Sequence, residues 1–376
     1  MRDHKHKVLF ARGYQNRKLN DYLRKGKRFI IVRGPRWSGK SYLVKMTLSS
    51  LDVSYIIIDV EEAMKKTGNQ KFEILINKNL KAFLSENRES KVVYGHLQHR
   101  IHVNRSDLYQ IFRKIDKAGK TVVVIDHADK MYLRSKMTKV FAATIDALDN
   151  ITLIFTPKST LRLEKILSVT DPEAPLHARG EVYIDLDYFS ANESIDFLET
   201  HLEQSDCDYN LSELDYVYEH IGGSPKWLSV YVSYREIGFK MPSALEKTYH
   251  EARNEILSEV GENSWKAVIL DAISRTMTSP FGYITRREVQ TELEKSSSLF
   301  FPLENRLIRE ASPLVQKTEF SYLQFKNKRS KRVSSPILPQ NISKYIAEME
   351  VDGYLQRLPG GRYRPVLPIV IYSFKK

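Results

Sequence analysis

Eight consecutive residues of this 376-residue chain have the types and spacing needed to hold the phosphates of a nucleotide. They are Gly34, Pro35, Arg36, Trp37, Ser38, Gly39, Lys40 and Ser41. The two glycines let the backbone wrap with its N–H groups inward, Lys40 can reach the β- and γ-phosphates, and the Ser41 hydroxyl can ligate Mg²⁺. The pattern predicts a phosphate-binding loop for ATP and Mg²⁺, and a chance glycine pair in a turn is the other interpretation. Trp37 is expected to pack within the protein.

A second chemical feature is Asp126, which ends the apolar run that starts at Val122. An aspartate at the carboxyl end of a strand near a phosphate-binding loop typically holds Mg²⁺, directly or through water. The same residue could simply cap a helix. The next position is His127, where many such ATPases have a glutamate that polarises the attacking water. Because imidazole is a weaker base than a carboxylate, we expect ATP binding with slow hydrolysis, in which Lys40, Asp126 and His127 are the catalytic candidates.

Strands and helices that would position these residues alternate in the first half of the chain. An apolar run over residues 29–33 leads into the loop. Further apolar runs cover residues 54–59, 121–126, 151–155 and 181–186, and helical spacing covers 71–86, 104–118 and 134–148. Strands that are apolar on both faces indicate a parallel sheet covered by helices. We therefore predict an α/β ATPase core over residues 1–190.

The middle of the chain predicts a helical lid domain over residues 191–260. Amphipathic spacing recurs over residues 191–204, 211–221, 225–234 and 242–260. The pair Gly222-Gly223 marks a break between two of these helices.

The last domain, residues 261–376, has the order helix, helix, helix and glycine-rich hairpin that is typical of a winged helix. The helices are expected at residues 265–275, after a capping box of Thr285 and Glu288, and at residues 340–352. Arginines at the hairpin could hold DNA phosphates: Arg357, Arg362 and Arg364. Against DNA contact, the third helix ends in an acidic stretch, and winged helices also serve as protein-contact modules.

An insertion at about residues 296–340 interrupts this domain. It carries the basic residues Lys326, Lys328, Arg329, Lys331 and Arg332 after an aromatic stretch. Such an arm can follow a nucleic-acid backbone or stack on bases, and a solvated loop is an equal alternative.

Net charge and composition narrow the class of protein. The formal net charge is +13, and residues 1–40 carry 13 Lys and Arg residues against two Asp and Glu residues. Basic ends around a mildly acidic middle favour a polyanionic partner, with a solvated basic surface as the alternative. The single cysteine, Cys207, excludes an internal disulfide, and no apolar run is long enough for a membrane span. We expect a soluble, cytoplasmic protein.

Six segments together resemble the archaeal-type P-loop ATPases, a group within the STAND and AAA+-related NTPases. The carriers are Phe10-x-Arg12 with Leu19 and Leu23, Gly34 to Ser41, Val122 to Asp126, Ala174 to Leu186, Phe189-Ser190-x-x-Glu193-x-x-x-Phe197-Leu198, and Gly222 to Pro225. The resemblance covers about residues 8–260. It implies a nucleotide-binding core with a helical lid.

The resemblance also implies roles for single residues and reveals departures from the pattern. Arg179 would stabilise charge near the γ-phosphate, Pro225 would lie in the lid, and Thr156 would occupy a phosphate-sensing turn that Pro157 stiffens. Departures at His127, at the turn that begins with Thr156, and at Asn16 and Arg17 put fast hydrolysis and adenine selectivity in doubt.

From the sequence we therefore expect a switch ATPase that couples nucleotide state to duplex DNA or to a partner on DNA. A defence or signalling scaffold that oligomerises on ATP is one alternative, and a non-hydrolysing, ATP-bound transcription factor is another. A homo-oligomer on ATP binding is possible, and a membrane partner is not expected. The histidine triplet His96, His99 and His102 is interpreted as a solvated segment and not as a metal site.

Overall fold

The computed structural model describes residues 11–51, 53–61, 107–130, 135–167, 171–177, 182–261, 264–279, 281–293, 295 and 339–375. The chain divides into two compact units, Met1–Thr248 and Tyr249–Lys376.

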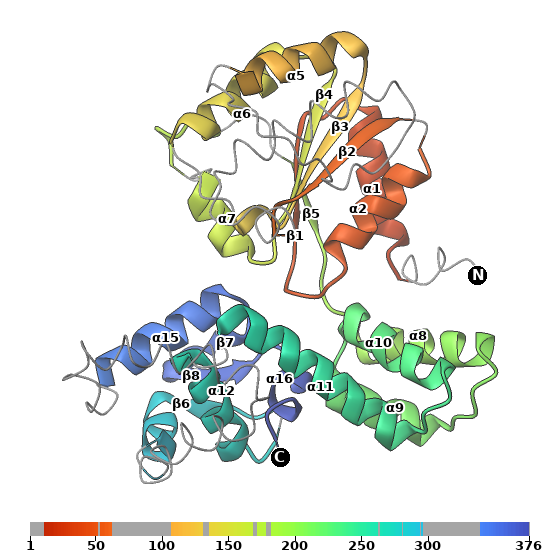
Figure 1. Ribbon diagram of the computed structural model, residues 1–376, viewed down its shortest axis with the longest axis vertical. Helices are drawn as coiled ribbons and strands as arrows, with labels where there is room; N and C mark the ends of the chain where they lie inside the picture. The colour runs from red at the N-terminus through yellow and green to blue at the C-terminus, as the bar shows by residue number, and fades with distance from the viewer. Residues whose placement is uncertain are drawn as a thin grey trace, which may run out of the picture. The chain divides into compact units, whose positions relative to one another are not determined.

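A five-stranded parallel sheet forms the centre of the first unit (Figure 1). Its strands are β1 (Phe29–Arg33), β2 (Ser54–Asp59), β3 (Thr121–Asp126), β4 (Ile151–Thr156) and β5 (Val182–Asp185), in the order β2-β3-β4-β1-β5. Almost every residue of the three central strands is buried, as the continuous apolar runs require of a sheet covered on both faces. The strands all point the same way, so their carboxyl ends gather at one edge.

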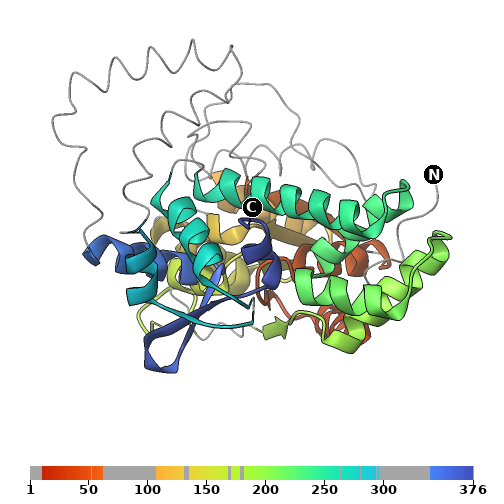
Figure 2. The ribbon, with the colours of Figure 1, turned by 90° about the horizontal axis from the view of Figure 1, so that it is seen from below.

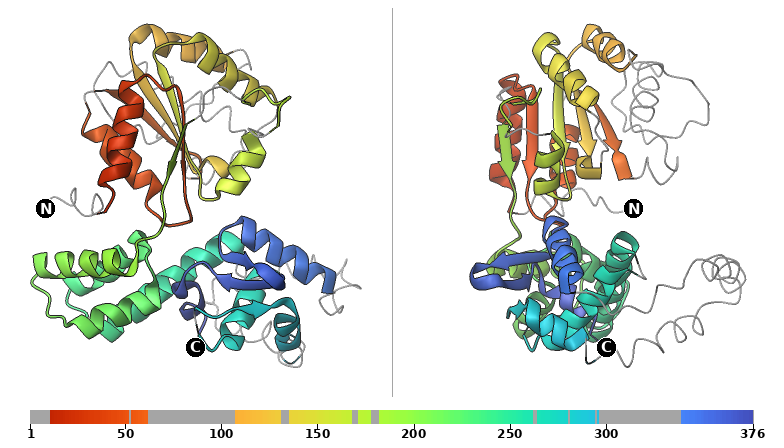
Figure 3. Two further views of the ribbon diagram at one scale, coloured as in Figure 1. Left: turned by 180° about the vertical axis from the view of Figure 1, so that it is seen from behind. Right: turned by 90° about the vertical axis from the view of Figure 1, so that its left-hand side faces the viewer.

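Helices cover both faces of this sheet and close two separate apolar cores (Figures 1 and 3). One face is covered by α1 (Gly13–Arg24) and α2 (Lys40–Ser49), whose Leu19, Leu43 and Leu48 pack with alternate residues of the strands. The other face is covered by α5 (Asp107–Ala118), α6 (Ser135–Ala147) and α7 (Thr160–Leu167), which contribute Phe112 and Phe141 to the second core.

The helices α8 (Ala191–Gln204), α9 (Leu211–Ile221) and α10 (Pro225–Glu236) follow the sheet in the same unit. Side-chain caps start each one, from Ser190, Asn210 and Ser224. Gly223 allows the segment before α10 to lie against Phe189, whose N–H donates to the Gly223 carbonyl at 2.8 Å. A Cβ atom at Gly223 would lie 1.9 Å from the Phe189 carbonyl oxygen, so no other residue fits there without a shift of the backbone.

The second unit combines helices with a small antiparallel sheet. Its elements are most of α11 (Met241–Val260), α12 (Trp265–Thr276), a helix over residues 286–293, α15 (Pro339–Val351), α16 (Pro368–Tyr372), and the strands β6 (Ile284–Thr285), β7 (Leu355–Leu358) and β8 (Arg362–Pro365). The strand order is β6-β8-β7, and the short turn Pro359–Gly361 joins the β7–β8 hairpin (Figure 2). Ile269, Ile273, Ile346 and Met349 form part of its buried interior.

Most elements expected from the sequence are confirmed within one or two residues. The helices over residues 191–204 and 211–221 have the predicted bounds, and the helix expected at 104–118 begins at Asp107. The strand expected over residues 181–186 is shorter, at Val182–Asp185. The helix expected at 71–86, the histidine triplet and the basic insertion lie outside the described residues.

Candidate functional site

The loop between β1 and α2 has the backbone geometry that its two glycines predicted. Gly34 has φ 147°, and a Cβ atom there would lie 2.3 Å from the Leu186 carbonyl oxygen. Gly39 has φ 89° and precedes the first residue of α2. Both positions therefore need glycine, because a side chain would meet the backbone at one and strain it at the other. The loop ends at the N-terminus of α2, where free backbone N–H groups favour anions.

Lys40 is folded back into the loop. Its ammonium group donates to the carbonyls of Gly34 at 3.0 Å and Pro35 at 2.6 Å, and the side chain is buried. Burial lowers the pKa of Lys40 to about 7; the nearby Arg36 lowers this pKa further, while the charges of Asp129 and Asp126 oppose the shift. A polyphosphate beside this amine would favour its charged form.

Asp126 contacts several polar side chains at the carboxyl edge of the sheet. Its Oδ1 accepts hydrogen bonds from the hydroxyls of Ser41 and Thr156, both at 2.6 Å. Lys45 lies 3.8 Å from Oδ2. Because β4 lies between β1 and β3, Asp126 reaches the loop across the end of β4, where Thr156 bridges the gap. The three predicted residues Ser41, Asp126 and Thr156 are thus in direct contact.

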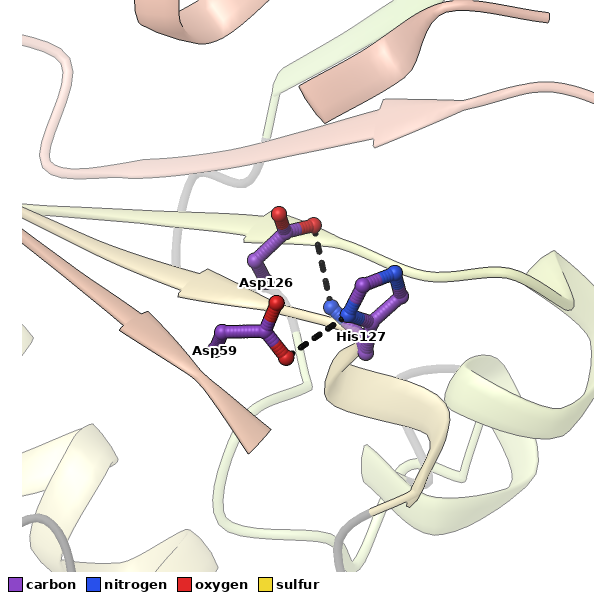
Figure 4. A group of neighbouring side chains, drawn as sticks. All are labelled: Asp59, Asp126 and His127. Atoms are coloured by element: carbon purple, nitrogen blue, oxygen red, sulfur yellow. Dashed lines mark hydrogen bonds and ion pairs between the residues drawn. The ribbon is translucent and has the colours of Figure 1, made fainter. Parts of the chain in front are cut away.

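His127 follows Asp126 and pairs with a carboxylate that the sequence analysis did not select (Figure 4). Its Nδ1 lies 2.9 Å from Oδ1 of Asp59, the last residue of β2. The backbone at His127 has φ 55°, an uncommon conformation for a residue other than glycine and one that recurs at functional sites. Burial alone would lower the pKa of His127, but the hydrogen bond to Asp59 and the charges of Asp126 and Asp59 together raise it above its ordinary value.

The donor set at this edge fits a hard divalent cation. Ligand atoms of Asp59, Asp126 and His127 all lie within 4.8 Å of one another, and the Ser41 hydroxyl contacts Asp126. Carboxylate and hydroxyl oxygens are the ligands that Mg²⁺ prefers alongside phosphate oxygens and water. The predicted pair Ser41 and Asp126 is therefore suitable for Mg²⁺, and Asp59 adds a second carboxylate nearby.

A second layer of charged groups supports this edge. Asp129 is buried and accepts the backbone N–H of Lys158 at 2.6 Å, while the Lys158 ammonium pairs with Glu61. These contacts tie the segment after β3 to the segments after β4 and β2. Neither Asp129 nor Glu61 was selected from the sequence. Each follows closely after an aspartate that ends an apolar strand, Glu61 after Asp59 and Asp129 after Asp126. This position in the sequence could have identified them.

The phosphate-binding loop also contacts the helices that follow the sheet. Ser224, which caps α10, donates its hydroxyl to the Trp37 carbonyl at 3.2 Å. The Trp37 ring packs edge-on against Trp227 of α10, with centroids 5.4 Å apart. Trp37 therefore packs within the protein, as predicted. Pro225 is buried in the first turn of α10, and the hydrogen bond to the loop comes from its neighbour Ser224.

A family model identifies the part of the chain that carries this geometry. Residues 30–168 match the model described as "AAA: ATPase family associated with various cellular activities". Residues 30–168 form an AAA-type ATPase domain. The matched segment contains Lys40, Ser41, Asp126, His127 and Thr156. The AAA assignment implies a nucleotide bound with a divalent metal.

Solved structures share the fold around this AAA-type ATPase domain. A Walker-type ATPase of Pyrococcus abyssi matches with a TM-score of 0.69 at 20% identity, over 98% of this chain and 97% of that chain. The ORC2 protein of Aeropyrum pernix matches with a TM-score of 0.54 at 12% identity, over 98% and 94%. The ORC1 protein of the same organism, solved in complex with DNA, matches with a TM-score of 0.52 at 14% identity, over 100% and 94%. Curated proteins give no significant match to the sequence.

Other predicted site residues fall partly inside and partly outside the described chain. Within the AAA-type ATPase domain, the loop residues Arg36 and Ser38 are buried, and the Ser38 carbonyl accepts a hydrogen bond from Arg12 at 3.3 Å. Arg179 and the basic residues of the insertion lie outside the described residues. No helix in the described part of the chain is long and apolar enough to cross a membrane.

In the second unit, the three predicted hairpin arginines do not share one face. Opposite residues of an antiparallel pair lie on the same face, and successive residues alternate. Arg362 lies opposite Leu358, and Arg364 lies opposite Gln356, to which it donates at 2.9 Å. Arg357 lies opposite Tyr363. Arg362 and Arg364 therefore occupy one face of the hairpin, and Arg357 occupies the other.

Proposed function

We propose that this protein is an ATP- and Mg²⁺-binding switch ATPase with slow hydrolysis, which couples its nucleotide state to the binding of duplex DNA or of a partner on DNA. The observation that carries the proposal is the loop itself, because one segment contacts both the predicted metal site and the helices that follow the sheet. The Ser41 hydroxyl donates to Asp126, and the carbonyl of Trp37, four residues before Ser41, accepts a hydrogen bond from Ser224.

For nucleotide binding, the loop and its neighbours supply each group that a triphosphate needs. The N–H groups at the start of α2 and the Lys40 ammonium would hold the β- and γ-phosphates. Ser41 and Asp126 would hold Mg²⁺, which neutralises phosphate charge when it is bound. Lys40 bonds to two loop carbonyls, and phosphate binding would exchange these partners for phosphate oxygens.

Slow hydrolysis follows from the pair His127 and Asp59. A general base must be neutral before it accepts a proton, and the raised pKa of His127 keeps a larger share of it protonated near neutral pH. Asp59 is the carboxylate that holds the ring in place through Nδ1, which leaves Nε2 as the nitrogen that can accept a proton. We propose that Asp59 and His127 together replace the glutamate of faster ATPases.

Coupling would pass through Trp37. A change in the loop on phosphate binding would alter the hydrogen bond from Ser224 and the ring contact with Trp227. Both residues belong to α10 or its cap, so the helices after the sheet would respond to the nucleotide. Gly223 keeps this segment against the backbone of Phe189 and restricts how it can move.

Support for DNA binding comes from the second unit and from one solved structure. The order of helices followed by the β7–β8 hairpin agrees with a winged helix, and Arg362 and Arg364 lie together on one hairpin face. The acidic end of α15 counts less against DNA than its sequence suggests, because Lys266 contacts Glu348 at 2.9 Å and Asp352 at 3.0 Å. The ORC1 protein of Aeropyrum pernix, which has a similar fold, was solved in complex with DNA.

The test is a mobility-shift titration with duplex DNA, with and without ATP and Mg²⁺, at several salt concentrations. We expect the parent protein to bind duplex with an affinity that ATP and Mg²⁺ change at least about fivefold, the lower end of typical coupling. Lys40→Ala should bind duplex without responding to ATP. Duplex binding that ignores ATP in the parent would contradict the switch, and oligomerisation on ATP without any DNA binding would favour the scaffold alternative.

A further inference from the structure

A turn in the second unit presents two aromatic rings to solvent. The described residues from 249 onward include three exposed large apolar side chains, Trp265, Phe281 and Tyr283. Phe281 and Tyr283 are each 55% exposed and lie two residues apart, directly before β6. Two of the three therefore belong to one short segment, and neighbouring exposed apolar side chains can form a binding surface.

Two hydrogen bonds hold the backbone beside these rings. The N–H of Gly282 donates to the Ser279 carbonyl at 3.0 Å, and the N–H of Phe281 donates to the Ser279 hydroxyl at 3.3 Å. A Cβ atom at Gly282 would lie 3.1 Å from the same carbonyl oxygen, so the turn is tight. Rings on a preformed turn lose little conformational entropy when they bind.

Arg362 of the hairpin lies against Tyr283. Its guanidinium carbon is 4.6 Å from the centre of the Tyr283 ring, a cation–π contact. The sheet explains the contact, because Thr285 lies opposite Arg362 in the β6–β8 pair, and Tyr283 precedes Thr285 by two residues. Arg364 lies two residues beyond Arg362 on the same face. The surface thus combines aromatic rings with guanidinium groups.

The hairpin that contacts Tyr283 is basic. The hairpin segment 355–365 has three arginines and no acidic residue. The nearest acidic residue in the sequence after Tyr283 is Glu288, whose carboxylate accepts the N–H of Thr285 at 2.6 Å and its hydroxyl at 2.8 Å. These hydrogen bonds lower the pKa of Glu288, and the one from the backbone N–H has the larger effect. The Glu288 carboxylate is thus engaged with Thr285 at the start of its own helix.

We propose that Phe281, Tyr283, Arg362 and Arg364 form a stacking platform for the bases of unpaired DNA, so that the second unit prefers single-stranded or locally opened DNA to intact duplex. The inference rests on the proposed function, since it takes DNA as the ligand. Aromatic rings offer a face to any base, and guanidinium groups contact both base faces and phosphates. An intact duplex keeps its bases stacked on one another and offers such rings only its backbone and groove edges.

The test compares three fluorescein-labelled DNA probes by anisotropy: a 20-nucleotide mixed-sequence single strand, the matched duplex, and that duplex with a central unpaired stretch. The parent should bind the single strand and the opened duplex at least about tenfold more tightly than the intact duplex. Tyr283→Ala should remove about tenfold of the single-strand affinity and leave the duplex affinity within about twofold. Tyr283→Phe should bind like the parent, because the ring is retained.

A direct stacking signal comes from 2-aminopurine placed in the single strand. Stacking on a ring quenches its fluorescence, so the parent and Tyr283→Phe should quench it on binding and Tyr283→Ala should not. Tyr216→Ala is the matched control, because Tyr216 is 45% exposed on α9, a helix rich in acidic residues, and its loss should change nothing. Thermal unfolding of each variant checks that it folds like the parent.

The outcomes separate the two proposals. Tight binding to intact duplex, with equal or weaker binding to the unpaired probes, overturns the platform and leaves the proposed function standing. The same is true if Tyr283→Ala weakens all three probes equally or none of them. Failure of the parent to bind any probe overturns DNA binding as a whole and assigns the exposed rings to a protein partner.

Discussion

The loop edge of the first unit and the hairpin face of the second unit both carry positive charge, but they hold it differently. At the loop edge, Lys40 is buried, bonded to carbonyls and close to the negative charges of Asp129 and Asp126. At the hairpin, Arg364 is exposed and donates a hydrogen bond to Gln356. A buried, closed set of charges suits one small anion at a fixed place, whereas exposed arginines suit an extended polyanion.

The two regions also differ in how well sequence spacing predicts which residues lie close together. At the loop, eight consecutive residues specify the backbone, so spacing and geometry agree. At the hairpin, the pairing of β6, β7 and β8 decides which residues meet, and these strands lie up to about 80 residues apart in the sequence. Motif spacing is therefore a better guide to the first region than to the second.

The largest expected effect is the loss of nucleotide binding in Lys40→Ala. The variant should fold, because it loses only two hydrogen bonds and both are local to the loop, but it should gain no thermal stabilisation from ATP and Mg²⁺. For the parent at 100 times the dissociation constant, binding should add about 2.7 kcal/mol to the free energy of unfolding. Lys25→Ala is the control, because Lys25 is exposed at the end of α1 and pairs with Asp21. Equal stabilisation of Lys40→Ala and the parent would refute the phosphate-binding loop.

Faster hydrolysis is expected when a glutamate replaces His127, provided that Asp59 is changed with it. His127→Glu alone would place a second carboxylate near Asp59 and raise the pKa of one of them. The double variant Asp59→Asn/His127→Glu removes this conflict and should release phosphate at least about tenfold faster than the parent, with the single variant between them. Phosphate release under saturating ATP is the measurement. A double variant slower than the parent would show that His127 is already the better base.

The hairpin arginines should differ according to their face. Each phosphate contact that is lost lowers the slope of log affinity against log salt by about 0.9. We therefore expect Arg362→Ala/Arg364→Ala to flatten the slope by about two and Arg357→Ala to leave it nearly unchanged, if DNA lies on the face that holds Tyr283. Binding to all duplex sequences should weaken alike, since phosphates carry no sequence information. Equal effects of the three arginines would place DNA across the hairpin edge.

A smaller effect is expected in the pH dependence of hydrolysis. His127 acts as a base only when neutral, so phosphate release should fall as the pH drops through its pKa, which Asp59 and Asp126 raise above the ordinary value. Asp59→Asn removes one of these charges and should move the acidic limb of the profile to lower pH. A limb that stays in place in Asp59→Asn would assign it to another group.

Much of the fold could be predicted because local signals agreed with tertiary structure. Helices α8 and α9 have their predicted bounds, since each starts at a side-chain cap and follows an apolar period. The loop and Asp126 were selected because the motif fixes their neighbours. Asp59 was missed although it ends an apolar strand as Asp126 does, and the two lie opposite each other in the β2–β3 register. The same rule, applied to every strand end, would have found it.

Contacts between distant segments could not be read from the sequence. The pairing of Lys266 with Glu348 and Asp352 joins residues more than 80 positions apart, and no local pattern predicts it. The stacking of Arg362 on Tyr283 depends in the same way on the β6–β8 pairing. Both contacts alter what the charges in this unit can do, because one neutralises an acidic helix end and the other joins an arginine to a ring.

The central claim, that nucleotide state and DNA binding are coupled, is tested most directly by measuring ATP affinity with and without saturating DNA. Coupling between two sites is reciprocal, so the factor by which ATP and Mg²⁺ change DNA affinity must equal the factor by which DNA changes ATP affinity. Isothermal titration of ATP and Mg²⁺ into the parent protein, alone and with DNA, gives that factor. The account predicts a change of at least about fivefold that matches the DNA titration. An ATP affinity that saturating DNA leaves unchanged would contradict it.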